Sequence, residues 1–143
     1  MTFEEILKEP LPSKMIDDEL YVCEMPERDI SLAGKAGSCK LIMWGKEGKD
    51  IPHFHIKSKS KRFNVAICLD KPMYFKHGIY IDELNSRQRK KLQKCLETKT
   101  MNGNTLWEDF VNHWNDSEEG MKNKVLLDKM PDYTKMTESI IER

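Results

Sequence analysis

The sequence predicts an α+β domain: an antiparallel sheet of about four strands, two main helices packed on one face, a short N-terminal helix and a C-terminal tail. Segments in which apolar and polar residues alternate follow one another from residue 19 to residue 75, and alternation is typical of half-buried strands. The connections between them are short, which favours antiparallel pairing of neighbours. Two later segments repeat apolar residues with a helical period and begin with capping residues.

The N-terminal part of the chain predicts one helix and one strand. Thr2 and Glu5 form a capping-box pair, which starts a short helix that prolines end. Residues 19–25 have the composition of a strand, and Pro26 stops it. Residues 27–38 are mostly small or charged, so we expect a surface loop there.

The centre of the chain supplies the remaining strands. Residues 39–44 and 53–57 predict one strand each, and residues 62–69 give the strongest strand pattern in the sequence, with β-branched and aromatic residues on one side. Residues 73–75 predict a short addition to the sheet.

Two helices follow the strands. Asn85 and Gln88 form a capping box at the start of the main helix, and Thr105 and Glu108 form another at the start of a helix that runs through Asn115. Apolar residues of the strands and of both helices should meet in one core. The predicted core consists of Phe54, Ile56, Phe63, Val65, Ile67, Leu92, Leu96, Trp107, Phe110 and Trp114.

We interpret residues 1–116 as one α+β domain and residues 117–143 as a polar tail that is either helical or partner-binding. Apolar residues make up 38% of the 143 residues and charged residues 34%, so much of the chain must lie at the surface. Residues 57–99 carry a net charge of +8 between flanks of −4 each. Such a basic block binds an anionic partner or neutralises its neighbours after folding.

Other features exclude several classes of protein. The acidic start lacks the apolar core of a signal peptide, and no apolar run approaches the ~18–20 residues needed to span a bilayer. The four cysteines form no CxxC pair, so we expect them to be reduced, in a cytoplasmic protein without membrane contact. The sequence contains no P-loop, dinucleotide-binding, zinc-finger or nucleophile-elbow motif.

The most informative segment is Pro52-His53-Phe54-His55. In a strand, Phe54 points to one side and both histidines point to the other, with Lys57, so the imidazoles lie roughly 6–7 Å apart on one face. Such a pair can bind zinc if the fold supplies a third ligand. The possible third ligands are Cys68, His77 and His113. Our expectation is nevertheless that no metal or cofactor is bound and that one histidine is packed while the other is solvated, with zinc at His53 and His55 as the alternative.

Acid–base catalysis is a second use of the same residues. Metal-free RNA cleavage needs two imidazoles beside cations. One of His53 and His55 would take the 2′-hydroxyl proton and the other would protonate the leaving oxygen, while Lys57 and Arg62 would stabilise the phosphorane charge.

Binding without catalysis is the third possibility. One side of the main helix carries four cations that could contact phosphates or an acidic partner protein. They are Arg87, Lys90, Lys91 and Lys94. The alternative is an ordinary solvated helix face.

The order of these motifs resembles a family of small bacterial and phage proteins of unknown function whose hallmark is Pro-His-Phe-His. The similarity spans residues 39–116. It is carried by Met43-Trp44, Pro52-His53-Phe54-His55, the strand Phe63–Leu69, Asn85-Ser86-Arg87-Gln88 and the tryptophan pair Trp107 and Trp114. The resemblance implies a compact α+β domain encoded in toxin–antitoxin-like settings, with His53 and His55 as functional positions.

We therefore expect an intracellular interaction or regulatory module, part of a toxin–antitoxin or phage-defence pair, that acts through the histidine face and the basic helix. The alternative is a small metal-independent ribonuclease. Whether the partner is protein or nucleic acid stays open, as does the oligomeric state.

Overall fold

The computed structural model describes residues 27–32, 36–43, 51–60, 62–122, 124–125 and 129–142. The predictions of an N-terminal helix and of a strand over residues 19–25 lie outside the described residues. Among those described, no helix has both the length and the apolar character needed to cross a bilayer.

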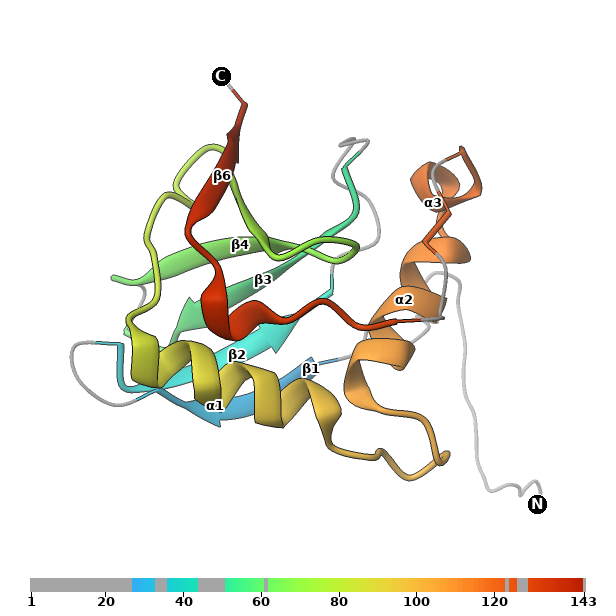
Figure 1. Ribbon diagram of the computed structural model, residues 1–143, viewed down its shortest axis with the longest axis horizontal. Helices are drawn as coiled ribbons and strands as arrows, with labels where there is room; N and C mark the ends of the chain where they lie inside the picture. Colours follow the sequence, from blue (N-terminus) through green and yellow to red (C-terminus); the bar gives the residue numbers. More distant parts are fainter. Residues whose placement is uncertain are drawn as a thin grey trace, which may run out of the picture.

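The fold is built on a six-stranded sheet whose strands lie in the order of the sequence (Figure 1). The strands are β1 (Glu27–Ser31), β2 (Ser38–Ile42), β3 (His53–Ser58), β4 (Asn64–Cys68), β5 (Met73–Lys76) and β6 (Glu138–Ile141). The first five pair antiparallel, as their short connections require. Strand β6 returns from the end of the chain and pairs parallel with β5.

The α+β class is confirmed, but the sheet is larger than the predicted four strands, and it is mixed. Strand β1 lies in the predicted surface loop, and only Ile30 of its side chains packs against the core. Strand β6 lies in the predicted tail and has no polar–apolar alternation. Both are edge strands, which are held by backbone pairing with one neighbour and therefore need little apolar signal.

Both main helices begin where the capping boxes predict. Helix α1 (Ser86–Glu97) is capped by Asn85, whose Oδ1 accepts from the Gln88 N–H at 2.8 Å. Helix α2 (Leu106–Asn115) is capped by Thr105 in the same way. The chain then forms the short helix α3 (Glu118–Lys122) and the 3₁₀ turn η1 (Tyr133–Lys135).

The main core lies between one face of the sheet and the helices α1 and α2. Nine of the ten predicted core residues are buried there; Phe63 is half-buried and packs against the cluster. A second, smaller apolar cluster lies on the opposite face of the sheet. Its buried members are Ala66, Cys68, Phe75 and Tyr80.

The segment that leads to β6 is tied to the end of β4. The Tyr133 hydroxyl donates to the carbonyl of Cys68 at 2.7 Å and lies 3.3 Å from that of Leu69. The Trp107 indole N–H of α2 donates to the same Leu69 carbonyl at 2.9 Å. These bonds supply donors to the carbonyl groups at the end of β4, so part of the predicted tail belongs to the fold.

We predict that Tyr133→Phe lowers the free energy of unfolding by about 1 kcal/mol, because it leaves the buried Cys68 carbonyl without its donor. Chemical denaturation measures this change. The exposed Met101→Ala is the control and should stay within about 0.5 kcal/mol of the parent protein. An unchanged Tyr133→Phe would show that this bond contributes nothing to stability.

Candidate metal centre

The pleat of β3 separates its side chains as the sequence predicts. Phe54 and Ile56 enter the main core, where neither is exposed, and His53 and His55 lie on the opposite face. Across the β3–β4 ladder, His53 faces Cys68, His55 faces Ala66 and Lys57 faces Asn64. The two imidazoles therefore stand beside small side chains of the neighbouring strand.

A third histidine comes from the far side of β4. On β5, Tyr74 belongs to the main core, so Phe75 and then His77 turn to the histidine face. A two-residue turn follows, in which the His77 carbonyl accepts from the Tyr80 N–H at 2.9 Å. Gly78 in this turn has φ +56°, a conformation that glycine adopts without strain.

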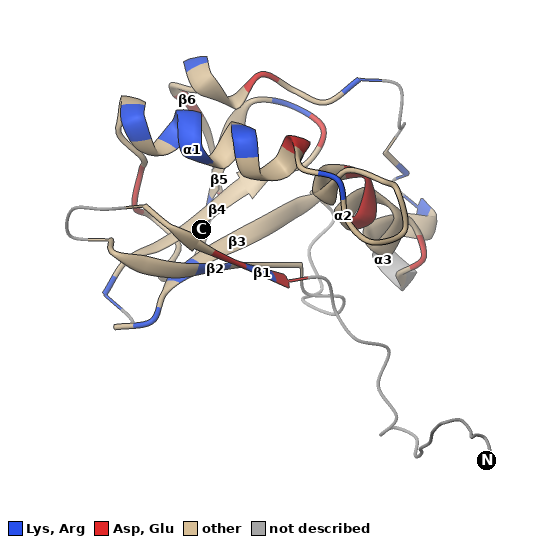
Figure 2. Ribbon diagram, turned by 90° about the horizontal axis from the view of Figure 1, so that it is seen from below, with Lys and Arg blue, Asp and Glu red and all other residues tan. Residues whose placement is uncertain are grey.

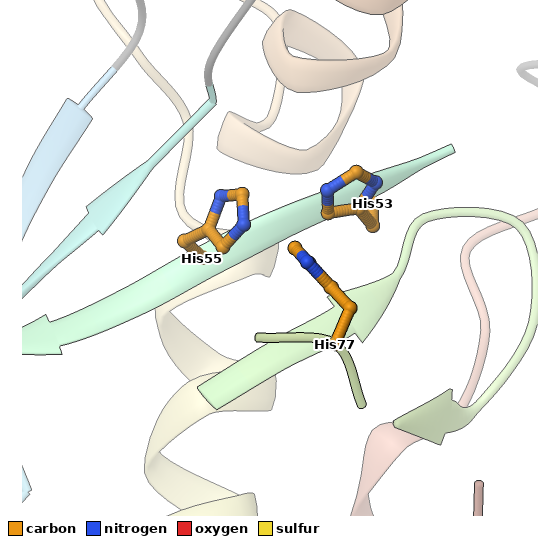
Figure 3. Close-up of side chains that lie close together, drawn as sticks. All are labelled: His53, His55 and His77. Atoms are coloured by element: carbon orange, nitrogen blue, oxygen red, sulfur yellow. The ribbon is translucent and has the colours of Figure 1, made fainter. Parts of the chain in front are cut away.

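The three imidazoles converge over β4 (Figure 3). One ring nitrogen from each of His53, His55 and His77 can be chosen so that all three lie within 4.8 Å of one another. The ring centroids are 4.8–5.5 Å apart. Strands two apart in a sheet are separated by about 10 Å. The side chains can bridge that distance because β4 presents only Ala66 between His55 and the β5 side of the sheet.

The site is buried, which differs from the outward-facing pair expected from the sequence. The exposed fractions are 3% for His53, 1% for His55 and 6% for His77. Aromatic rings surround them. Phe75 and Trp114 have ring centroids 4.8 Å and 6.4 Å from that of His53, and Tyr80 has its centroid 4.3 Å from that of His55. These rings come from three elements: Phe75 from β5, Tyr80 from the turn after it and Trp114 from α2.

The orientation of His53 is fixed by backbone. Its Nδ1 lies 2.6 Å from the carbonyl oxygen of Ile51. A carbonyl only accepts, so Nδ1 is the donor in this contact. The carbonyl of Pro52 in turn accepts from the Leu69 N–H at 2.9 Å, which holds this segment against the end of β4. A histidine that donates one N–H to a carbonyl is typical of metal ligands.

Of the three possible third ligands, the structure places His77 with the pair. Cys68 is on the same face but outside the group, and burial, helped by the nearby Asp70, raises the pKa of its thiol to about 12. His113 lies on α2, where burial lowers its pKa, and is also outside the group. The cluster that the structure describes is therefore all imidazole.

The predicted cations are outside the histidine cluster, although Lys57 is on the same face of β3 as His53 and His55. Arg62 is exposed between β3 and β4, and Lys57 is half-buried. The four cations of α1 are exposed. Helix α1, with basic positions along its length, packs on the main core at one face of the sheet (Figure 2), so the sheet separates it from the histidines. An anionic partner bound along α1 would therefore lie on the opposite side of the sheet from His53 and His55.

Three further residues of the site were not identified from the sequence: Asn64, Ala66 and Tyr80. A glycine turn between His77 and Tyr80 is a local signal that both side chains come together. No local sequence pattern marks Ala66 and Asn64 as part of the site, because their place beside the histidines depends on which strands pair with β4.

Comparisons with models of protein families, with functionally curated proteins and with solved structures gave no match. The resemblance to the Pro-His-Phe-His family therefore stays a prediction.

We predict that Gly78→Ala weakens zinc binding about tenfold, in the range seen when groups that orient ligands are changed. A Cβ there meets no atom within 4 Å, so the effect comes from the positive φ, which costs about 1 kcal/mol and displaces His77. Zinc affinity is measured by competition with a chelating dye.

The matched control is Gly103→Ala, which has φ +89° and equal space but lies in the loop before α2. It should lose similar stability and keep its zinc affinity. Equal affinities in the two variants would contradict a role of the turn in the site.

Proposed function

We propose that this protein binds a divalent transition metal, zinc above all, through His53, His55 and His77. The observation that carries the proposal is the convergence of three imidazoles, from one strand and one turn, on a common point in a buried aromatic setting. Imidazole is a ligand that suits zinc, copper, iron and nickel. Zinc is favoured because it accepts three protein nitrogens and takes its fourth ligand from water or substrate.

The geometry needs only a modest adjustment. Tetrahedral zinc with Zn–N bonds of about 2.0–2.1 Å places its nitrogen ligands about 3.3 Å apart. The longest separation within the group is at most 4.8 Å. Small rotations of the side chains close this difference, while the backbone of β3 and the bond from His53 to Ile51 stay in place.

The ligand set favours a reactive site over a purely structural one. Structural zinc is usually closed by four protein ligands, whereas catalytic zinc commonly has three and activates a bound water. Three neutral imidazoles do not reduce the charge of the metal, so its full positive charge acts on the bound water. Ribonuclease activity of His53 and His55 without metal stays a prediction, and their burial gives it less support because RNA must contact both rings.

We predict that the protein binds one zinc per chain and that His53→Ala, His55→Ala and His77→Ala each lower zinc affinity by more than 100-fold, because loss of a direct ligand exceeds the roughly 10–100-fold effect of outer groups. Elemental analysis gives the stoichiometry, and chelator competition gives the affinity. His113→Ala is the control and should bind zinc like the parent protein. A parent protein without stoichiometric zinc would refute the proposal.

A second proposed function is the binding of an anionic partner by α1, in a toxin–antitoxin or phage-defence setting as the family resemblance implies. It is supported by the exposure of all four cations on this helix. Lys91 also donates a hydrogen bond to the Ser31 carbonyl, so its replacement would also remove a contact within the fold. The other three cations are therefore the better positions for testing this surface.

For this surface we predict that changing Arg87, Lys90 and Lys94 together to alanine weakens binding of a labelled RNA oligonucleotide at least tenfold at low salt. Each lost phosphate contact should also lower the slope of log K against log salt by about 0.7. The control changes three other exposed lysines to alanine, with the same loss of charge: Lys122, Lys129 and Lys135. Equal losses in both triple variants would show that only net charge matters.

A further inference from the structure

Asn64 is a polar residue that the histidine cluster does not include. It begins β4, two residues before Ala66, so its side chain lies on the same sheet face as the histidines. Its backbone is held on the β5 side by Asp82. The Asn64 N–H donates to the Asp82 carboxylate at 2.8 Å, and the Asp82 N–H donates to the Asn64 carbonyl at 3.1 Å. The side chain is therefore carried by a rigid part of the sheet.

The side-chain oxygen of Asn64 has no donor among the described residues. Only 8% of the residue is exposed, and its Oδ1 is buried. A buried acceptor without a donor costs about 1–3 kcal/mol. On this face its cross-strand neighbour is the half-buried Lys57. The position thus combines an acceptor that needs an O–H or N–H donor with a positive charge beside it.

We propose that Asn64 Oδ1 accepts a hydrogen bond from the water molecule that completes the coordination of the metal. This inference rests on the proposed metal site. Three histidines fill three positions of a four-coordinate metal, and a water molecule in the fourth has O–H groups to donate. Asn64 is then a positioning residue that holds the water in one orientation.

The burial of the site sets the class of ligand that competes with this water. Because the histidines are exposed by 6% or less, a ligand that competes with this water must itself be small, such as a small anion, and polymers are excluded. An anion such as azide binds a metal but has no hydrogen to donate to Asn64. The residue therefore favours water over such anions.

The test uses the full chain loaded with cobalt in place of zinc, because the visible absorption of cobalt reports its coordination. Azide is titrated at neutral pH into the parent protein, Asn64→Leu, Asn64→Ala and Asn64→Asp. Loss of the acceptor should make azide bind roughly three- to tenfold more tightly to the Leu and Ala variants. Asn64→Asp retains an acceptor oxygen and should bind azide no more tightly than the parent protein. Asn112→Leu makes the same change on the exposed face of α2 and should have no effect.

Two outcomes would overturn the inference in distinguishable ways. If all variants bind cobalt with the parent spectrum but share its azide affinity, Asn64 does not hold the fourth ligand and the metal site stands. If the parent protein binds no cobalt or zinc, the metal site itself is wrong. The alanine variant adds no bulk, so it measures the same loss if the leucine variant misfolds.

Discussion

The register between β3 and β4 is the constraint on which the rest of the structure depends. Phe54 faces Ile67 and Ile56 faces Val65, and all four side chains are fully buried in the main core. Because side chains alternate along a strand, a slip by one residue would exchange the two faces of β3. Packing in the main core therefore fixes the imidazoles on the other side of the sheet.

The candidate site is assembled from that fixed strand and from one irregular segment. After Lys76 the chain leaves the ladder with β4, makes the turn that carries His77 and Tyr80, and returns at Asp82 to pair with Asn64. This excursion supplies the third imidazole, and its Tyr80 ring packs against His55. Sites on regular strands are more rigid than sites on loops, so two of the three proposed ligands are well ordered by the fold itself.

Local signals predicted a large part of the fold. The capping boxes at Asn85 and Thr105 set both helix starts because they depend on residues three apart in the chain. The apolar periods identified β3, β4 and nine of the buried residues of the main core. Strands β1 and β6 were not predicted. An edge strand is stabilised by backbone pairing with a neighbouring strand, and its own composition therefore gives little indication of it.

By itself, the sequence determined that His53 and His55 share one face opposite Phe54, because the two-residue period of a strand is a property of the local backbone. It also narrowed the third ligand to three residues without choosing among them. Only the tertiary structure selected His77, buried the cluster and moved the basic helix to the other side of the sheet. Those outcomes depend on which strands become neighbours and on the small size of Ala66 between them, and neither is encoded within one segment of the chain.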